Sequence, residues 1–155
     1  MSDTTAQPTV RDYMTADPTT LGPDDPLLQA VLTVRSLSIR HIPVVKDGEL
    51  VGLITDRDLA RASPSILGRT TPEEYNQVFQ QNTIQRVMIK NPTTINADAL
   101  LGDAVRMMHE NKWGSIPVVD ENSKLVGILT LTDVLRYALT TLETSGTGTS
   151  ITLDI

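Results

Sequence analysis

The chain has 155 residues, of which 39% are apolar, 21% charged and only 3% aromatic, a composition typical of a globular protein with an aliphatic core. Its net charge of −6 argues against general nucleic-acid binding, because neutralising phosphates requires an excess of lysine and arginine. The sequence has no cysteine and only two histidines, which excludes disulfides and thiol catalysis, and we predict no metal site built by the protein.

Residues 1–9 precede the first patterned segment and lack the basic and apolar regions of a signal peptide. No apolar run reaches the roughly 18 residues of a membrane helix. We therefore predict a cytoplasmic protein with no membrane partner. We also expect two flexible ends, residues 1–9 and the Gly/Thr/Ser-rich residues 143–155.

A first structural unit is predicted over residues 10–62. A short strand at Thr19–Leu21 precedes Asp24-Asp25-Pro26, which is typical of an N-cap followed by a helix-initiating proline. Apolar residues spaced three and four apart then predict a helix over 27–37. Two apolar strands, Ile42–Val45 and Leu50–Thr55, flank a Lys-Asp-Gly-Glu turn, and a closing helix follows from Asp56.

Residues 63–83 are a longer connection than the fold requires. Thr71-Pro72-Glu73-Glu74 predicts the start of a helix, and Tyr75, Val78 and Phe79 would share one side of it. Two interpretations of this helical insert remain open at this point, packing against the first unit or a contact in a dimer.

Residues 84–142 repeat the first unit. A shift of 74 residues places Met14 on Met88 and superimposes the Pro-Thr-Thr and Ile-Pro-Val-Val segments. A shift of 75 then superimposes two Gly-x-x-Thr-x-x-Asp turns, with Gly52, Thr55 and Asp58 in the first unit and Gly127, Thr130 and Asp133 in the second. We predict an α+β fold in which two β-α-β-β-α repeats pack sheet to sheet with pseudo-twofold symmetry and leave two clefts.

The ordered set Val-x-x-x-Met-Thr, Pro-x-Thr, Ile-Pro-Val-Val and Leu-Val-Gly-x-x-Thr-x-x-Asp-Leu resembles the cystathionine-β-synthase-type (CBS) domain. The repeat resembles two such domains in tandem, a CBS pair. The resemblance extends from about Val10 to Leu139. It implies clefts that bind AMP, ADP, ATP or, in some members, S-adenosylmethionine or NAD. It also implies a homodimer that regulates another protein and is not itself an enzyme.

The Thr55/Asp58 turn has two interpretations on its own residues. Threonine followed three residues later by an acid is a capping-box pattern, which would contribute about 1 kcal/mol as a helix cap without binding anything. The same helix start offers free N–H groups to a phosphate, and the carboxylate can accept hydrogen bonds from both ribose hydroxyls. The resemblance favours ribose binding, and the two roles are compatible.

Further ligand contacts follow from the resemblance, position by position. The stretches 16–21 and 90–95 would line the base, and the residues before each Ile-Pro-Val-Val proline would pack on base and ribose. The predicted ligand-binding residues are Ala16, Thr20, Leu21, Arg40, His41, Ile42, Thr55, Arg57, Asp58, Lys90, Thr94, Ile95, Gly114, Ser115, Ile116, Thr130, Thr132 and Asp133.

The two turns differ in charge. Arg40, His41, Arg57 and Arg61 lie near the first turn, whereas the second carries Thr132 in place of Arg57. We therefore expect the Asp58 site to favour the more phosphorylated ligand. Trp113, which precedes the second Ile-Pro-Val-Val strand, could stack on a base or cover the core. His41 could contact phosphate or lie on the surface.

The prediction that follows is a stand-alone regulatory module that binds an adenine nucleotide, which can bring Mg²⁺ with it. The identity of the regulated protein is not predicted. The alternative is a structural or interaction module whose clefts hold no small ligand and whose Thr/Asp pairs are only caps. An enzyme is not expected, because the sequence offers no nucleophile, general base or Gly-rich phosphate loop in a known arrangement.

Overall fold

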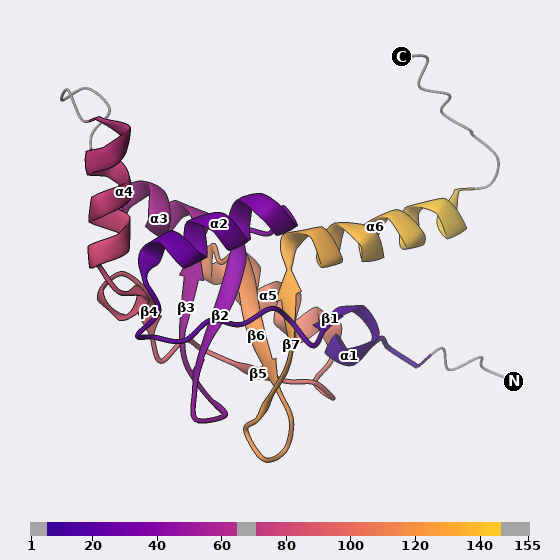
Figure 1. Cartoon of the computed structure of the whole chain (residues 1–155). Coiled ribbons are helices and arrows are strands. Elements are labelled where there is room, and N and C mark those ends of the chain that lie inside the picture. The colour runs from indigo at the N-terminus through magenta and orange to yellow at the C-terminus, as the bar shows by residue number, and fades with distance from the viewer. Residues whose placement is uncertain (1–5, 65–70, 147–155) are drawn as a thin grey trace, which may run out of the picture.

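The computed structural model of the chain describes residues 6–64 and 71–146 (Figure 1). The predicted flexibility of the two ends falls largely on residues 1–5 and 147–155, which lie outside the described residues. None of the helices described is long and apolar enough to cross a membrane.

The predicted α+β class is confirmed, with strands gathered into two sheets and helices packed around them (Figure 1). The helical segments are α1 (Val10–Tyr13), α2 (Leu27–Leu37), α3 (Asp56–Ala62), α4 (Pro72–Gln81), a 3₁₀ turn (Ile84–Arg86), α5 (Leu101–Asn111) and α6 (Leu131–Ser145). The strands are β1 (Thr15–Ala16), β2 (His41–Lys46), β3 (Glu49–Thr55), β4 (Ile89–Lys90), β5 (Ile95–Asn96), β6 (Ser115–Val119) and β7 (Leu125–Thr130).

The two repeats exchange their first strands. One sheet has the order β2-β3-β4, so β4, which opens the second repeat, pairs with β3 of the first. The other has the order β1-β7-β6-β5, so β1, from the first repeat, pairs with β7 of the second. The helical turn that precedes each exchanged strand also packs against the other repeat. Val10 is fully buried in the second core, and Ile84 is fully buried in the first.

The exchange explains the glycine of each Gly-x-x-Thr-x-x-Asp turn. Gly52 pairs with Lys90 of β4, and a Cβ at Gly52 would lie 3.0 Å from the Ile89 carbonyl oxygen. Gly127 pairs with Ala16 of β1 in the same way, and its Cβ would lie 3.0 Å from the Thr15 carbonyl oxygen. The sulfur of the preceding methionine, Met88 or Met14, lies even closer, so both glycines make room for the exchanged strand and for that methionine side chain.

Several local predictions are confirmed and two are wrong. The strand predicted at Thr19–Leu21 is reduced to one isolated bridge between Leu21 and Val44. The helix over 27–37 forms, but its N-cap is Pro26 and not an aspartate. Asp25 instead stabilises the preceding turn, where its Oδ2 accepts a hydrogen bond from the Gly22 N–H at 2.7 Å. The insert helix α4 begins after Thr71 as predicted, and Phe79 is fully buried in the first core. Packing is therefore at least one of its roles.

Candidate functional site

The Thr55/Asp58 turn forms the N-terminus of α3 as a capping box. Asp58 Oδ2 accepts hydrogen bonds from the Thr55 N–H at 2.9 Å and from the Thr55 hydroxyl at 2.8 Å. The Thr55 hydroxyl in turn accepts from the Asp58 N–H at 3.2 Å. Among the described residues, Asp58 Oδ1 has no hydrogen-bond donor. The cap thus uses one carboxylate oxygen and leaves the other available.

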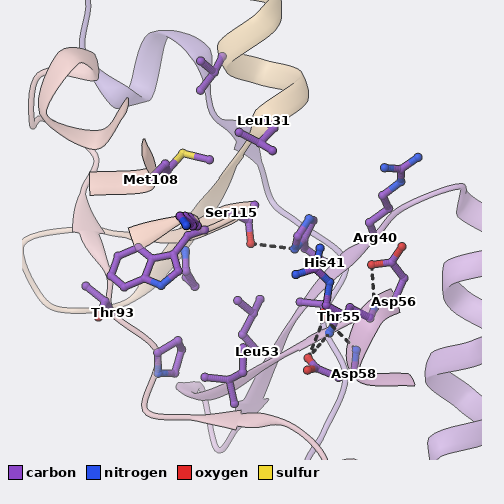
Figure 2. Close-up of a pocket in the computed structure, with 18 of the residues that line it drawn as sticks. Arg40, His41, Leu53, Thr55, Asp56, Asp58, Thr93, Met108, Ser115 and Leu131 are labelled. Carbon is purple, nitrogen blue, oxygen red and sulfur yellow. Dashed lines mark hydrogen bonds between the residues drawn. The ribbon is translucent and has the colours of Figure 1, made fainter. Parts of the chain in front are cut away.

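This turn opens onto a cleft of about 970 Å³ between the two repeats (Figure 2). The first repeat contributes the ends of β2 and β3 and the first turns of α3. The second contributes the segment after β4, the C-terminal half of α5 and the start of α6. Figure 2 shows Thr55 and Asp58 on one side and Thr93, Met108 and Ser115 on another. The strand exchange places residues 89–93 beside Asp58, because β4 is the neighbour of β3.

The cleft has a local excess of positive charge. Four cationic side chains line it, Arg40, Arg57, Arg61 and Lys112, against two carboxylates, Asp56 and Asp58. Among the described residues, none of the four cations is in an ion pair with a carboxylate. In a chain with net charge −6, this concentrates positive potential in one concave site, which favours an anionic ligand.

The opposite wall is largely apolar. Trp113 and Val105 are half-buried there and pack against the second core, while Met108 is almost fully buried and still borders the cleft. Both sequence interpretations of Trp113 therefore remain compatible with its position, because it covers the core and also lines the cleft. An apolar wall facing polar and charged groups is the usual composition of a small-molecule site.

His41 and Ser115 join the two repeats at the edge of the cleft. They occupy equivalent positions, 74 residues apart, and the His41 Nδ1 lies 3.0 Å from the Ser115 hydroxyl oxygen (Figure 2). The imidazole lies against Gly114, where a Cβ would come within 2.8 Å of His41 Cε1. A glycine at this position therefore allows β2 and β6 to be linked by this hydrogen bond.

Burial lowers the pKa of the His41 imidazole from its ordinary 6.5, against the opposing charge of Asp56. The folded chain thus prefers the neutral ring, and the unfolded chain takes up a proton first as the pH falls below 6.5. We expect the thermal unfolding midpoint to fall on acidification through this range, and to fall less in His41→Asn. The midpoints would be measured by circular dichroism. An equal fall with pH in the wild type and in His41→Asn would contradict a role of His41 in this pH dependence.

The structure brings some of the predicted site residues together and separates others. Seven of them line the cleft: Arg40, His41, Thr55, Arg57, Asp58, Gly114 and Ser115. Ile42 and Ile116 are fully buried, and Ile95 is 8% exposed, in the two hydrophobic cores. The remaining residues are not part of its lining: Ala16, Thr20, Leu21, Lys90, Thr94, Thr130, Thr132 and Asp133.

Several lining residues were not predicted by the sequence. The predicted stretch 90–95 reaches the cleft through Pro92 and Thr93, and Ile89 precedes it. Lys112 and His109 enter from the end of α5, where Lys112 is the C-cap with a left-handed φ of 56°. No motif marks His109 or Lys112, whereas Pro92 and Thr93 belong to the repeated Pro-Thr-Thr segment. The pairing of β4 with β3 brings residues 89–93 beside Asp58.

Comparison with known proteins gives a consistent result. The CBS domain family model matches residues 10–65 and 84–140. A CBS domain-containing protein of Dictyostelium discoideum is 31% identical over 135 residues, which cover 86% of this chain and 93% of that protein.

Two CBS-pair proteins of known structure share the fold. CBSX2 of Arabidopsis thaliana is 28% identical with a TM-score of 0.73, over 89% of this chain and 99% of that one. CBSX2 has also been crystallised in complex with AMP. The CBS pair of MJ0100, crystallised with 5′-methylthioadenosine and S-adenosyl-L-methionine, is 26% identical with a TM-score of 0.72, over 87% of this chain and 98% of that one. The chain therefore belongs to the CBS domain family and has the fold of a tandem CBS pair.

Proposed function

We propose that this protein is a regulatory module that binds an adenine nucleotide in the cleft beside Asp58. The observation that carries the proposal is the arrangement of one available carboxylate oxygen, Asp58 Oδ1, within a cationic cleft that joins both repeats. A carboxylate that can accept two hydrogen bonds matches the paired hydroxyls of a ribose. CBSX2 with AMP and MJ0100 with two adenosine derivatives support this ligand class.

The other parts of the cleft complement the remaining parts of a nucleotide. The apolar wall with Trp113 and Met108 suits a purine ring, and Arg40, Arg57 and Arg61 suit phosphate oxygens. The volume of about 970 Å³ is within the range of small-molecule sites. Three arginines exceed what one phosphate requires, so we propose a preference for ATP or ADP over AMP, with Mg²⁺ entering as a counterion of the ligand.

Regulation would follow from the position of the cleft between the repeats. A ligand that contacts both repeats favours the relative arrangement in which both sets of contacts are made, which is a shift in population between conformations. The shape change would then be sensed by a partner protein. We assign no catalytic role, and the cytoplasm, where adenine nucleotides are abundant, is the compartment that this function needs.

A homodimer is part of the proposal. In Figure 1, helix α6 extends away from the rest of the molecule. Its exposed side carries a row of leucines at helical spacing, with Leu131, Leu135, Leu139 and Leu142 between 54% and 69% exposed. Such a row is typical of a helix that packs on another helix. Light scattering of the purified chain measures the mass of the assembly, and the mass of one 16.9-kDa chain would contradict the dimer.

The proposed function predicts thermal stabilisation by adenine nucleotides. A ligand at 100 times its dissociation constant stabilises the folded state by about 2.7 kcal/mol, which is roughly 5 to 10 °C for a chain of this length. Unfolding would be followed with AMP, ADP, ATP, NAD and S-adenosylmethionine, and repeated for ATP with Mg²⁺ and with a chelator. No shift with any of them, in protein freed of co-purified nucleotide, would favour the alternative of an interaction module without a ligand.

A further inference from the structure

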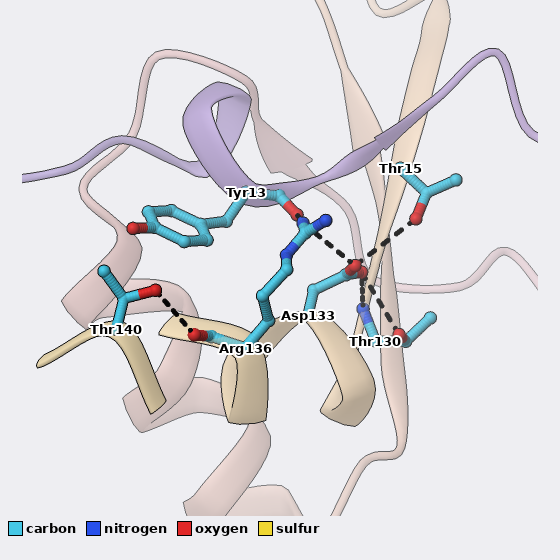
Figure 3. A network of polar contacts seen from close by, with 6 residues as sticks. All are labelled: Tyr13, Thr15, Thr130, Asp133, Arg136 and Thr140. Atoms are coloured by element: carbon cyan, nitrogen blue, oxygen red, sulfur yellow. Dashed lines mark hydrogen bonds and ion pairs between the residues drawn. The ribbon is translucent and has the colours of Figure 1, made fainter. Parts of the chain in front are cut away.

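The second Thr/Asp turn is built like the first but differs in what surrounds its carboxylate. Asp133 Oδ2 accepts hydrogen bonds from the Thr130 N–H at 2.9 Å and the Thr130 hydroxyl at 3.1 Å, the same cap that Asp58 makes. Its Oδ1, however, accepts from the Thr15 hydroxyl at 3.3 Å and from Arg136 Nη2 at 3.4 Å (Figure 3). Asp133 is 5% exposed, and both of its carboxylate oxygens accept hydrogen bonds from the protein.

Arg136 is held in place by more than its aspartate. Its Nη2 also donates to the Tyr13 carbonyl oxygen at 2.7 Å, and its guanidinium carbon lies 5.8 Å from the centre of the Tyr13 ring (Figure 3). The Tyr13 ring is itself fixed by an edge-to-face contact with Tyr137 at 5.1 Å. The exchanged segment that contains α1 and β1 therefore fixes Arg136 against Asp133.

The corresponding residues around the first turn cannot make these contacts. A shift of 75 places Arg136 on Arg61, and a shift of 74 places Thr15 on Ile89 and Tyr13 on Val87. Ile89 has no hydroxyl to donate to Asp58, and Val87 has no ring for Arg61. Arg61 and Ile89 instead line the open cleft. The difference between the turns thus lies in the exchanged segments, and the capping residues are the same.

We infer, on the basis of the proposed function, that each chain binds one adenine nucleotide, at Asp58, because Thr15 and Arg136 occupy the hydrogen-bonding positions that a ribose would need at Asp133. A second ribose would have to replace two hydrogen bonds at once, those from Thr15 and from the 59%-exposed Arg136, on a carboxylate that is itself 7% exposed. The hydrogen bonds of the second turn hold α1 and β1 against α6, whereas the first turn is the ligand site.

Isothermal titration calorimetry with ATP and with AMP tests this stoichiometry. We expect one ligand per chain, lost in Asp58→Ala and retained in Asp133→Ala. The double variant Thr15→Ile/Arg136→Ala removes both donors from Asp133 Oδ1 and is expected to gain a second site. The matched variant Arg61→Ala, at the equivalent position of the first repeat, is expected to gain none. Two ligands per wild-type chain, or a folded double variant that still binds one, would overturn the inference.

Carboxylate labelling of the unaltered protein tests, without any ligand or variant, whether Asp133 is shielded by Thr15 and Arg136. We call the Thr130/Asp133 turn closed in this sense. A water-soluble carbodiimide with glycine methyl ester, followed by peptide mass mapping, should modify Asp58 readily and Asp133 much more slowly. Equal labelling of the two aspartates would overturn the closed turn, even if nucleotide binds at Asp58. A protected Asp133 in a protein that gives no heat with either nucleotide would instead refute the proposed function and leave the closed turn standing.

Discussion

Replacement of Asp58 by alanine is expected to weaken AMP and ATP binding by about 10- to 150-fold, because a hydrogen bond to a charged group contributes roughly 1.5–3 kcal/mol. Asp58 Oδ1 is the carboxylate oxygen that the cap leaves without a donor among the described residues, and Asp58 borders the cleft. The ribose hydroxyls lose their acceptor in the variant. Titration calorimetry measures the change, and an unaltered dissociation constant would refute ribose binding at this turn.

The same substitution also removes a helix cap, so stability needs its own control. Losing such a cap costs about 1 kcal/mol. Glu74 forms an equivalent capping box with Thr71 at the start of α4, and neither residue lines the cleft. Glu74→Ala should therefore reduce thermal stability as Asp58→Ala does, while the nucleotide affinity stays that of the wild type. Weaker binding in Glu74→Ala would attribute the effect to lost stability.

Reversal of two cleft charges, Arg57→Glu with Arg61→Glu, is expected to reduce ATP affinity by about 100-fold or more and AMP affinity by a smaller factor. At a separation of about 6 Å and an effective dielectric constant of 20 to 40, each charge–phosphate pair contributes roughly 1.4 to 2.8 kcal/mol. ATP carries more phosphate charge than AMP and loses more. Binding of adenosine, which has no phosphate, should change little.

The control for this variant changes the net charge equally but outside the cleft. Arg35 and Arg106 are exposed and do not line it. Arg35→Glu/Arg106→Glu should therefore bind ATP almost as the wild type does at 0.15 M salt, where charges beyond roughly 8 Å are screened. Equal losses for ATP and AMP in the cleft variant would place the phosphates away from Arg57 and Arg61.

Much of the local structure could be predicted from the sequence because its signals are local. The Thr55/Asp58 spacing predicted a capping box, and the alternation of apolar and turn residues predicted the paired strands. The N-cap of α2 was wrong because two neighbouring signals compete: Asp25 precedes the proline but bonds back to Gly22. A side chain that can cap a helix can equally close the turn before it.

The composition of the site could be predicted only in part, because it depends on contacts between distant segments. Sequence similarity placed Asp58 and Asp133 in equivalent turns, yet one is open and the other is closed. The cause is the partner strand of each turn, which comes from the other repeat. The aligned repeats show threonine at position 15 where the other repeat has Ile89. The effect of this difference could not be predicted, because the sequence does not show that Thr15 contacts Asp133 and that Ile89 lines the cleft.

The exchanged strands have a consequence for how the chain can be divided. If it is cut between α3 and α4, each fragment carries the edge strand of the other: β1 leaves with the first fragment although it belongs to the second sheet, and β4 leaves with the second. Neither fragment contains a complete sheet or core. The two halves should thus behave as complementary fragments that recover structure only when mixed, and a single repeat could not be transplanted alone. The smallest part of this architecture with complete sheets and cores is the pair.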